Sequence, residues 1–164
     1  MALSLKNIKY KILSIFPILL LLFVSFNGNS IIDFNFFSIN LHFIIVYYWA
    51  LRDPDNFGYG FIFLSGIIND VVYGLPFGVN ALCLLLIAAV AAYVRVVAVR
   101  VTLVNDWISF VPALLFANFI YFLSLYFSSF EINYLSLFKD SLFTLIFYPI
   151  MWALFSFIIN LRKS

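Results

Sequence analysis

The chain has 164 residues, of which 66% are hydrophobic and 10% are charged, with a formal net charge of +2. Soluble domains carry ~25% charged residues, so this composition excludes an ordinary soluble protein and indicates an integral membrane protein. The one cysteine, Cys83, lies in an apolar run and excludes an internal disulfide.

A transmembrane helix needs roughly 20 predominantly apolar residues. The hydrophobic segments predict an all-α fold, with six spans in one transmembrane domain that covers residues 1–164. We place these spans at residues 10–26, 35–51, 57–73, 79–99, 107–127 and 141–160. The first segment resembles a signal peptide, but no small-residue cleavage motif follows it, so we expect an uncleaved span. The connections are too short to form extramembrane domains.

The basic residues orient this six-helix bundle. Eight of the nine lysines and arginines fall on one side of it, and only Lys139 falls on the other. The eight are Lys6, Lys9, Lys11, Arg52, Arg95, Arg100, Arg162 and Lys163. Because cytoplasmic loops carry the excess of Lys and Arg, both termini are predicted to be cytoplasmic.

The sequence offers no pattern typical of an enzyme. A single histidine makes a histidine metal cluster or a Ser/His/Asp triad unconvincing. There is no phosphate-binding Walker loop and no dinucleotide glycine fingerprint. The aromatic residues lie within apolar segments rather than among basic ones, which argues against nucleic-acid binding. We therefore expect a protein that is not an enzyme and that uses no cofactor or metal.

One stretch, "GIINDVVYGLPFG" at residues 66–78, places a carboxylate inside an apolar segment. An ionised Asp at the centre of a membrane helix costs roughly 2.5–3.5 kcal/mol on insertion scales, so such residues usually have a use. One interpretation is that Asp70 contacts a partner, a substrate or a proton. The other is that Asp70 lies near the outer end of its span and is partly hydrated there.

The glycines around Asp70 also have two interpretations. Gly66, Asp70 and Gly74 share one helix face because four residues turn the helix by little more than one full turn. Small residues at that spacing allow a second helix to approach closely. Pro76 interrupts helical hydrogen bonding, so residues 74–78 are predicted to form a tight turn that ends at Gly78. Packing and turn formation alone would explain Gly74 and Gly78.

Other polar and aromatic residues favour structural roles. His42 is expected to be a satisfied core or interface histidine rather than a ligand. Arg52 and the acids beside Pro54, Asp53 and Asp55, are expected to form a solvated loop. Aromatic residues at the ends of segments predict interfacial belts. These are Tyr47, Tyr48, Trp49, Trp107 and Trp152.

Residues 48–82, "YWALRDPDNFGYGFIFLSGIINDVVYGLPFGVNAL", resemble the core of the rod shape-determining MreD family. That family has a Pro-containing loop, a glycine-rich start of a span, G-x-x-x-D, G-x-x-x-G and an apolar helix that ends in basic residues. The matching positions are Pro54, Gly58, Gly60, Gly66, Asp70, Gly74, Pro76, Gly78 and Leu82. Chain length, the number of spans and the short basic C-terminus also fit.

The resemblance implies a non-enzymatic, multi-pass subunit of the bacterial inner membrane that belongs to the cell-elongation machinery. Its partners would be an MreC-type scaffold protein and, through it, the actin-like MreB filament and the peptidoglycan synthases, within the lipid bilayer. Small-residue helix faces would pack against a partner's transmembrane helix. Asp70 and the turn from Gly74 to Gly78 would shape the contact.

The family also implies a fold similar to the substrate-binding subunits of energy-coupling-factor vitamin transporters, with six helices around a cavity. A transporter subunit of that type is therefore the alternative function. Its ligand would meet polar groups in the cavity. Candidates are His42, Asn69, Asp70 and Asn118. A purely structural membrane protein is a third possibility.

Overall fold

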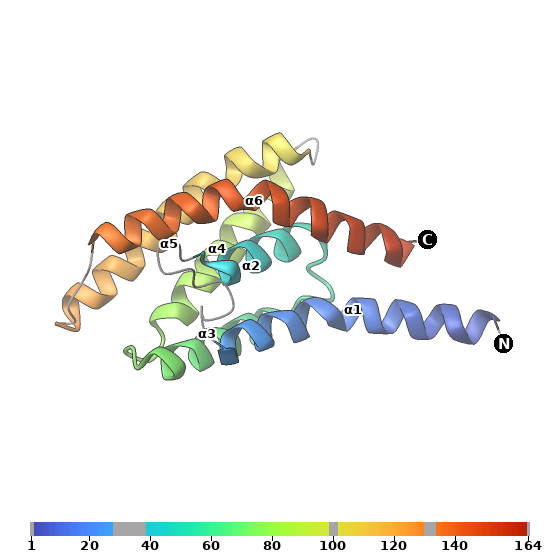
Figure 1. Ribbon diagram of the computed structural model, residues 1–164, viewed down its shortest axis with the longest axis horizontal. Coiled ribbons are helices and arrows are strands. Elements are labelled where there is room, and N and C mark those ends of the chain that lie inside the picture. The colour runs from blue at the N-terminus through green and yellow to red at the C-terminus, as the bar shows by residue number, and fades with distance from the viewer. Residues whose placement is uncertain (1, 28–38, 99–101, 130–133, 164) are drawn as a thin grey trace.

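A computed structural model describes residues 2–27, 39–98, 102–129 and 134–163. The described residues form six helices and no strands, which confirms the all-α prediction (Figure 1). The helices are α1 (Ala2–Asn27), α2 (Leu41–Arg52), α3 (Tyr59–Tyr73), α4 (Val79–Val97), α5 (Leu103–Phe127) and α6 (Tyr134–Lys163). Both termini lie on the right in Figure 1, whereas the α3–α4 turn and the start of α6 lie on the left.

Within the described ranges, three helices are long and apolar enough to cross a membrane. They are Val79–Val97, Leu103–Phe127 and Leu135–Arg162 within α6. The last three predicted spans fall on these helices. However, α6 begins at Tyr134, so part of the predicted connection at residues 128–140 is helical. Residues Lys11–Asn27 of α1 and all of α3 form shorter apolar helices. This pattern indicates a membrane protein.

The second helix differs from its prediction at 35–51, of which residues 35–38 lie outside the described part. It has 12 residues. At 1.5 Å per residue this is about 18 Å, well below the ~30 Å of a bilayer core. Asp53, just before Pro54, leaves the helical region (φ −147°, ψ 58°), and this ends the helix because a residue that precedes proline avoids the helical region.

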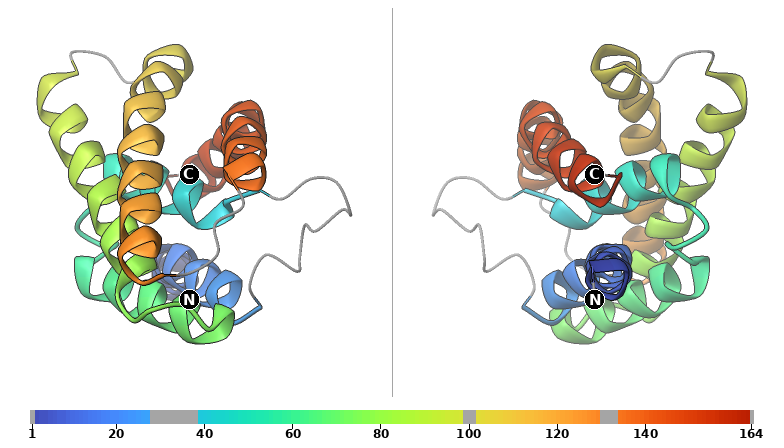
Figure 2. Two further views of the ribbon diagram at one scale, coloured as in Figure 1. Left: turned by 90° about the vertical axis from the view of Figure 1, so that its left-hand side faces the viewer. Right: turned by 90° about the vertical axis from the view of Figure 1, so that its right-hand side faces the viewer.

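All residues of α2 from Leu41 to Leu51 are buried. A helix that is apolar on every side must be enclosed, and α2 packs against α1, α4 and α6. The end-on views show α2 between α4 and α5 on one side and α6 on the other, with α1 and α3 beneath (Figure 2). The prediction of an interfacial belt was therefore wrong for Tyr47, Tyr48 and Trp49, which are at most 1% exposed.

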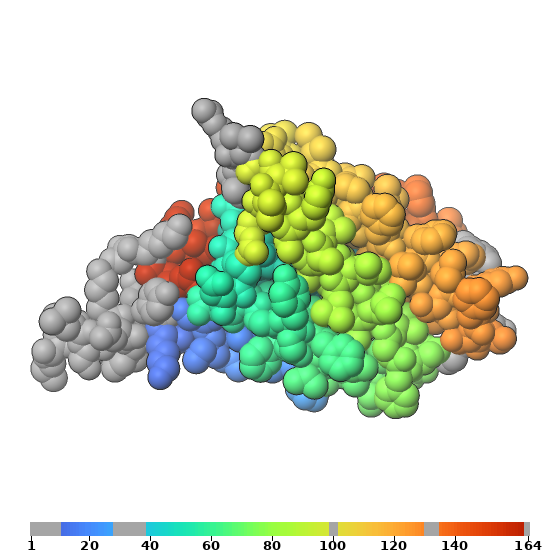
Figure 3. Space-filling model, turned by 180° about the vertical axis from the view of Figure 1, so that it is seen from behind, coloured from blue at the N-terminus to red at the C-terminus, as the bar shows by residue number. Residues whose placement is uncertain are grey.

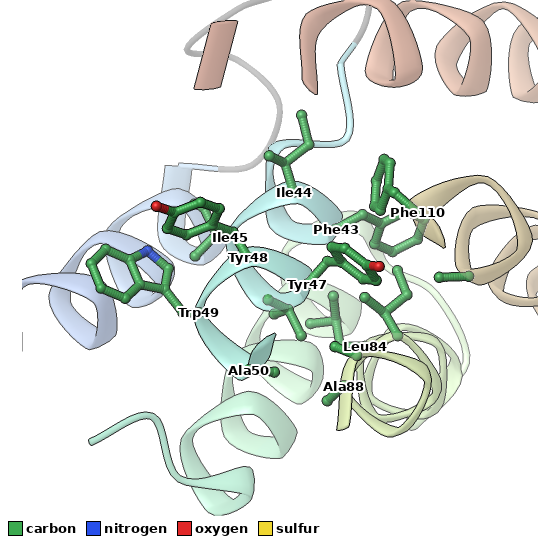
Figure 4. Close-up of a cluster of buried hydrophobic side chains, with 14 of the residues drawn as sticks. Phe43, Ile44, Ile45, Tyr47, Tyr48, Trp49, Ala50, Leu84, Ala88 and Phe110 are labelled. Atoms are coloured by element: carbon green, nitrogen blue, oxygen red, sulfur yellow. The ribbon is translucent and has the colours of Figure 1, made fainter. Parts of the chain in front are cut away.

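Aromatic rings join α2 to α5 and α6. Tyr47 points toward Phe110 and toward α4, while Tyr48 and Trp49 point the other way (Figure 4). The ring centroids of Tyr47 and Phe110 are 5.0 Å apart, and Phe110 stacks on Tyr148 at 4.6 Å. Such aromatic pairs add stability beyond the area they bury. The short second helix is thus the centre of the core.

The outer helices carry an apolar surface. Helices α3, α4 and α5 lie next to one another on the face shown in Figure 3. Large apolar side chains on these helices are exposed, among them Leu64 (52%), Val96 (82%) and Phe116 (60%). Soluble monomers rarely expose broad apolar patches, whereas lipid tails cover such a surface without cost.

Candidate functional site

The turn between α3 and α4 is built on two glycines. Gly74 adopts a left-handed backbone (φ 63°) and ends α3, and Gly78 is also left-handed (φ 96°). The N–H of Leu75 donates to the carbonyl oxygen of Asp70 at 2.9 Å, and the N–H of Gly74 donates to that of Val71 at 3.3 Å. This is the usual way in which glycine closes a helix, and it confirms the predicted turn.

The Asp70 side chain joins the two ends of this turn. Its Oδ2 accepts the N–H of Gly78 at 2.7 Å. Its Oδ1 accepts both the backbone N–H and the side-chain Nδ2 of Asn80 at 2.9 Å. These backbone groups begin α4, whose first N–H groups lack partners within the helix and favour a negative charge. Asp70 therefore caps α4 from the end of α3.

Burial defines what Asp70 can do. The residue is 0% exposed, so its carboxylate presents no surface for direct contact with a partner. Any influence of Asp70 on a partner would pass through the turn that it holds. Sequence reasoning missed Asn80, although an asparagine just after Gly78 in an otherwise apolar run was a visible signal.

Gly66 lets α3 and α4 approach closely. A Cβ atom placed on Gly66 would lie 2.2 Å from the Cα of Ala81, which is too close for any side chain. The preceding Ser65 hydroxyl lies 2.5 Å from that of Ser25, so the same part of α3 also packs on α1. The small-residue face around Gly66 is therefore used within the chain.

A cavity of about 190 Å³ lies beside the turn. Residues from α2 to α6 line it, together with Leu75 of the turn and Asn40 just before α2. Its polar side chains are Asn40, His42, Asn69, Asn80, Asn118 and Asp140. The structure thus brings together the three predicted cavity residues His42, Asn69 and Asn118, whereas Asp70 does not line the cavity.

Two of the lining residues have a buried side-chain atom without a hydrogen-bond partner in the described structure: Nε2 of His42 and Oδ1 of Asn69. The two residues are only 3% and 6% exposed. By contrast, Nδ2 of Asn118 donates to Ser141 Oγ at 2.8 Å. Because buried polar groups are almost always satisfied, the atoms of His42 and Asn69 call for a water molecule or a ligand.

A buried charge cluster lies at the opposite end of α2. Arg52 contacts Asp106 of α5 at 2.7 Å, and Trp152 of α6 donates to the same carboxylate oxygen at 2.9 Å. The Arg52 guanidinium also lies over the rings of Tyr48 and Trp152, 5.5 and 5.4 Å from their centroids. Asp106 is 2% exposed. Asp106 is therefore a second buried acid beside Asp70 in the described part of the chain.

A second ion pair joins Arg162 of α6 to Asp53, the residue that directly follows Arg52 at the end of α2. Asn56 also donates to Asp53 at 2.9 Å. The prediction of a solvated loop was wrong for Arg52 and Asp53, although Asp55 is exposed. The reason is tertiary, since α5 and α6 bring Asp106 and Arg162 to residues 52–53.

In the described ranges, no group of three or more His, Cys, Asp or Glu side chains is arranged to hold an ion. The arrangement that remains is a rigid turn, a polar cavity beside it and an ion-pair cluster at the far end of α2. No protein-family model, curated protein or solved structure matches this chain.

Proposed function

We propose that this chain is a non-enzymatic, MreD-like membrane subunit that scaffolds lateral peptidoglycan synthesis and so maintains cell shape. It would be a multi-pass protein of the bacterial inner membrane with both termini in the cytoplasm. Its partner would be an MreC-type protein, which would link it to the MreB filament and the peptidoglycan synthases. The basic residues of the cytoplasmic side support this orientation.

The observation that carries the proposal is that the residues of the resemblance act as one structural unit. Gly66 sets the distance between α3 and α4, Gly74 and Gly78 shape the turn, and Asp70 fastens it to α4. These contacts give the turn and the adjoining ends of α3 and α4 a rigid surface. Rigid, preorganised surfaces bind partners at a lower entropic cost.

The turn presents Phe77 to the outside, and its side chain is 79% exposed. Val71 and Val72 at the end of α3 are also exposed, at 59% and 46%. Under this proposal, the braced turn and this end of α3 contact the partner's transmembrane helix. The role assigned to Asp70 is then to position Phe77 rather than to touch the partner.

Co-purification with the MreC-type protein of the same genome tests the proposal. Phe77→Ala should lower the amount of partner recovered and widen rod-shaped cells, without changing the membrane level of the protein. Phe119→Ala is the matched control, because Phe119 lies on α5 and is also exposed, at 58%. Normal partner recovery and normal cell width with Phe77→Ala would contradict this contact surface.

The cavity favours the second candidate, a vitamin-binding transporter subunit. Its volume of about 190 Å³ is below the ~300–1,000 Å³ of pockets that enclose drug-sized ligands, and we therefore rank this function second. A vitamin that raises the melting temperature of the purified protein would favour transport over scaffolding.

A further inference from the structure

We propose that the polar cavity lined by residues of helices α2 to α6 binds a small organic cation that carries a primary ammonium group. This inference goes beyond the scaffolding function and does not depend on it. It rests on the unpartnered atoms of the cavity, on the charge of its lining and on its size.

The unpartnered atoms require a hydrogen-bond donor. Asn69 Oδ1 is an acceptor only, so a molecule that satisfies it must offer an N–H or O–H group. His42 lines the same cavity, and its unpartnered Nε2 accepts a hydrogen bond when Nδ1 carries the ring proton. A primary ammonium group supplies three N–H donors from one atom, more than a hydroxyl group supplies.

The lining has an acidic character. Asp140 contributes a carboxylate to the cavity lining, and no lysine or arginine lies among the described residues that line the cavity. The rings of Tyr73 and Tyr121 also belong to the lining, and aromatic faces attract cations. An anion in the cavity would meet the like charge of Asp140. The lining therefore selects against anions and favours a cation.

The volume limits the ligand to a few heavy atoms. The cavity of about 190 Å³ is smaller than the ~300–1,000 Å³ pockets of drug-sized ligands, so it suits a small amine. A bare metal ion is not favoured, since no cluster of three His, Cys, Asp or Glu side chains occurs in the described part. Ethanolammonium has a suitable size and also carries a hydroxyl group.

Three probes of similar size but different charge test this assignment: ethanolammonium, ethylene glycol and glycolate. Each is titrated calorimetrically into the purified full chain in phosphatidylcholine nanodiscs. We expect saturable ethanolammonium binding, about tenfold or more tighter than binding of the other two, as one well-placed ionic hydrogen bond provides. Equal affinities for the three probes, or no saturable binding of ethanolammonium, would overturn the proposal.

Two variants check that the binding occurs in this cavity. Asn69→Leu removes the free acceptor at similar volume, and Asp140→Asn removes the charge. Each should weaken ethanolammonium binding about fivefold or more, whereas Phe77→Ala, outside the cavity, should not change it. Unchanged affinity in both cavity variants would refute the site. The comparison of probes on the unchanged chain decides the class of ligand even where a variant fails to fold.

The ammonium group has two possible sources, a free amine or the headgroup of phosphatidylethanolamine. Adding that lipid to the nanodiscs distinguishes them. A headgroup that occupies the cavity will raise the apparent Kd of free ethanolammonium, whereas a site reserved for free amines will leave it unchanged. Because these titrations contain no partner protein, their failure would not affect the scaffolding proposal, and loss of partner binding would not affect the cavity.

Discussion

Replacement of Asp70 by alanine separates two views of this buried acid. If Asp70 were an unpaired charge in lipid, its removal would relieve a cost of roughly 2.5–3.5 kcal/mol and would not destabilise the protein. In the structure, however, its carboxylate accepts three N–H groups from Gly78 and Asn80. Asp70→Ala leaves these donors without their acceptor. The sign of the change in the free energy of unfolding therefore distinguishes the two views.

The magnitude follows from the three hydrogen bonds. Each hydrogen bond to a charged group contributes ~1.5–3 kcal/mol, but neighbouring contributions do not add fully. Gly78 is also partly exposed, so water can reach its N–H once the carboxylate is gone. We expect a loss of about 3–5 kcal/mol, which is less than the full sum of the three contributions because they are not additive. Asp70→Asn should lose about 2 kcal/mol, because its NH₂ group faces an N–H donor.

Reversible unfolding in bilayers or mixed micelles measures these values. The double-mutant cycle with Asn80→Ala isolates the side-chain hydrogen bond between residues 70 and 80, and we expect a coupling energy of about 1–2 kcal/mol. A stability of Asp70→Ala within about 0.5 kcal/mol of the unchanged chain, or above it, would refute the role of Asp70 in holding the turn.

Three further substitutions probe the packing and the ion pairs. Gly66→Ala should lower stability by about 1–3 kcal/mol because the added Cβ has no room beside Ala81. Gly60→Ala is the control and should be neutral or stabilising, because the space around Gly60 is open. Equal melting temperatures of the two variants would contradict this prediction. Asp106→Ala should cost about 3 kcal/mol in chemical unfolding because Arg52 loses its buried partner; a loss below about 1 kcal/mol would indicate an exposed pair. Arg162→Met removes the ion pair with Asp53 and should speed amide hydrogen exchange at the end of α6 about tenfold. Exchange in α4 is the internal reference. Equal acceleration in α4 would indicate global destabilisation instead.

The parts of the fold that depend on local sequence were predictable. Long apolar runs identify α4, α5 and α6 because a span is a property of about 20 consecutive residues. The turn was also predictable, since Gly74, Pro76 and Gly78 restrict the backbone by themselves. Even so, the start of α6 at Tyr134 was missed, because a polar stretch can continue a helix beyond its apolar segment.

The parts that depend on distant residues were not predictable. Arg52 and Asp53 read as a solvated loop because their partners, Asp106 and Arg162, lie 54 and 109 residues further along the chain. Likewise, an aromatic run such as that of Tyr47 to Trp49 suits a membrane interface as well as a core. Only the surrounding helices decide between the two. Polar residues near the cavity were visible, but their convergence was not.

The burial of α2 explains why the polar groups gather at its two ends. A helix of about 18 Å cannot carry its own ends to both bilayer surfaces, so its terminal groups must find partners inside the protein. At the C-terminal end of α2 these partners are present, because Arg52 pairs with Asp106 and Asp53 pairs with Arg162. At the N-terminal end no ion pair is present among the described residues of α2, and His42, whose Nε2 has no hydrogen-bond partner there, lines the cavity. The ion pairs make the C-terminal end a fixed joint between helices, whereas the N-terminal end adjoins a cavity with capacity to bind.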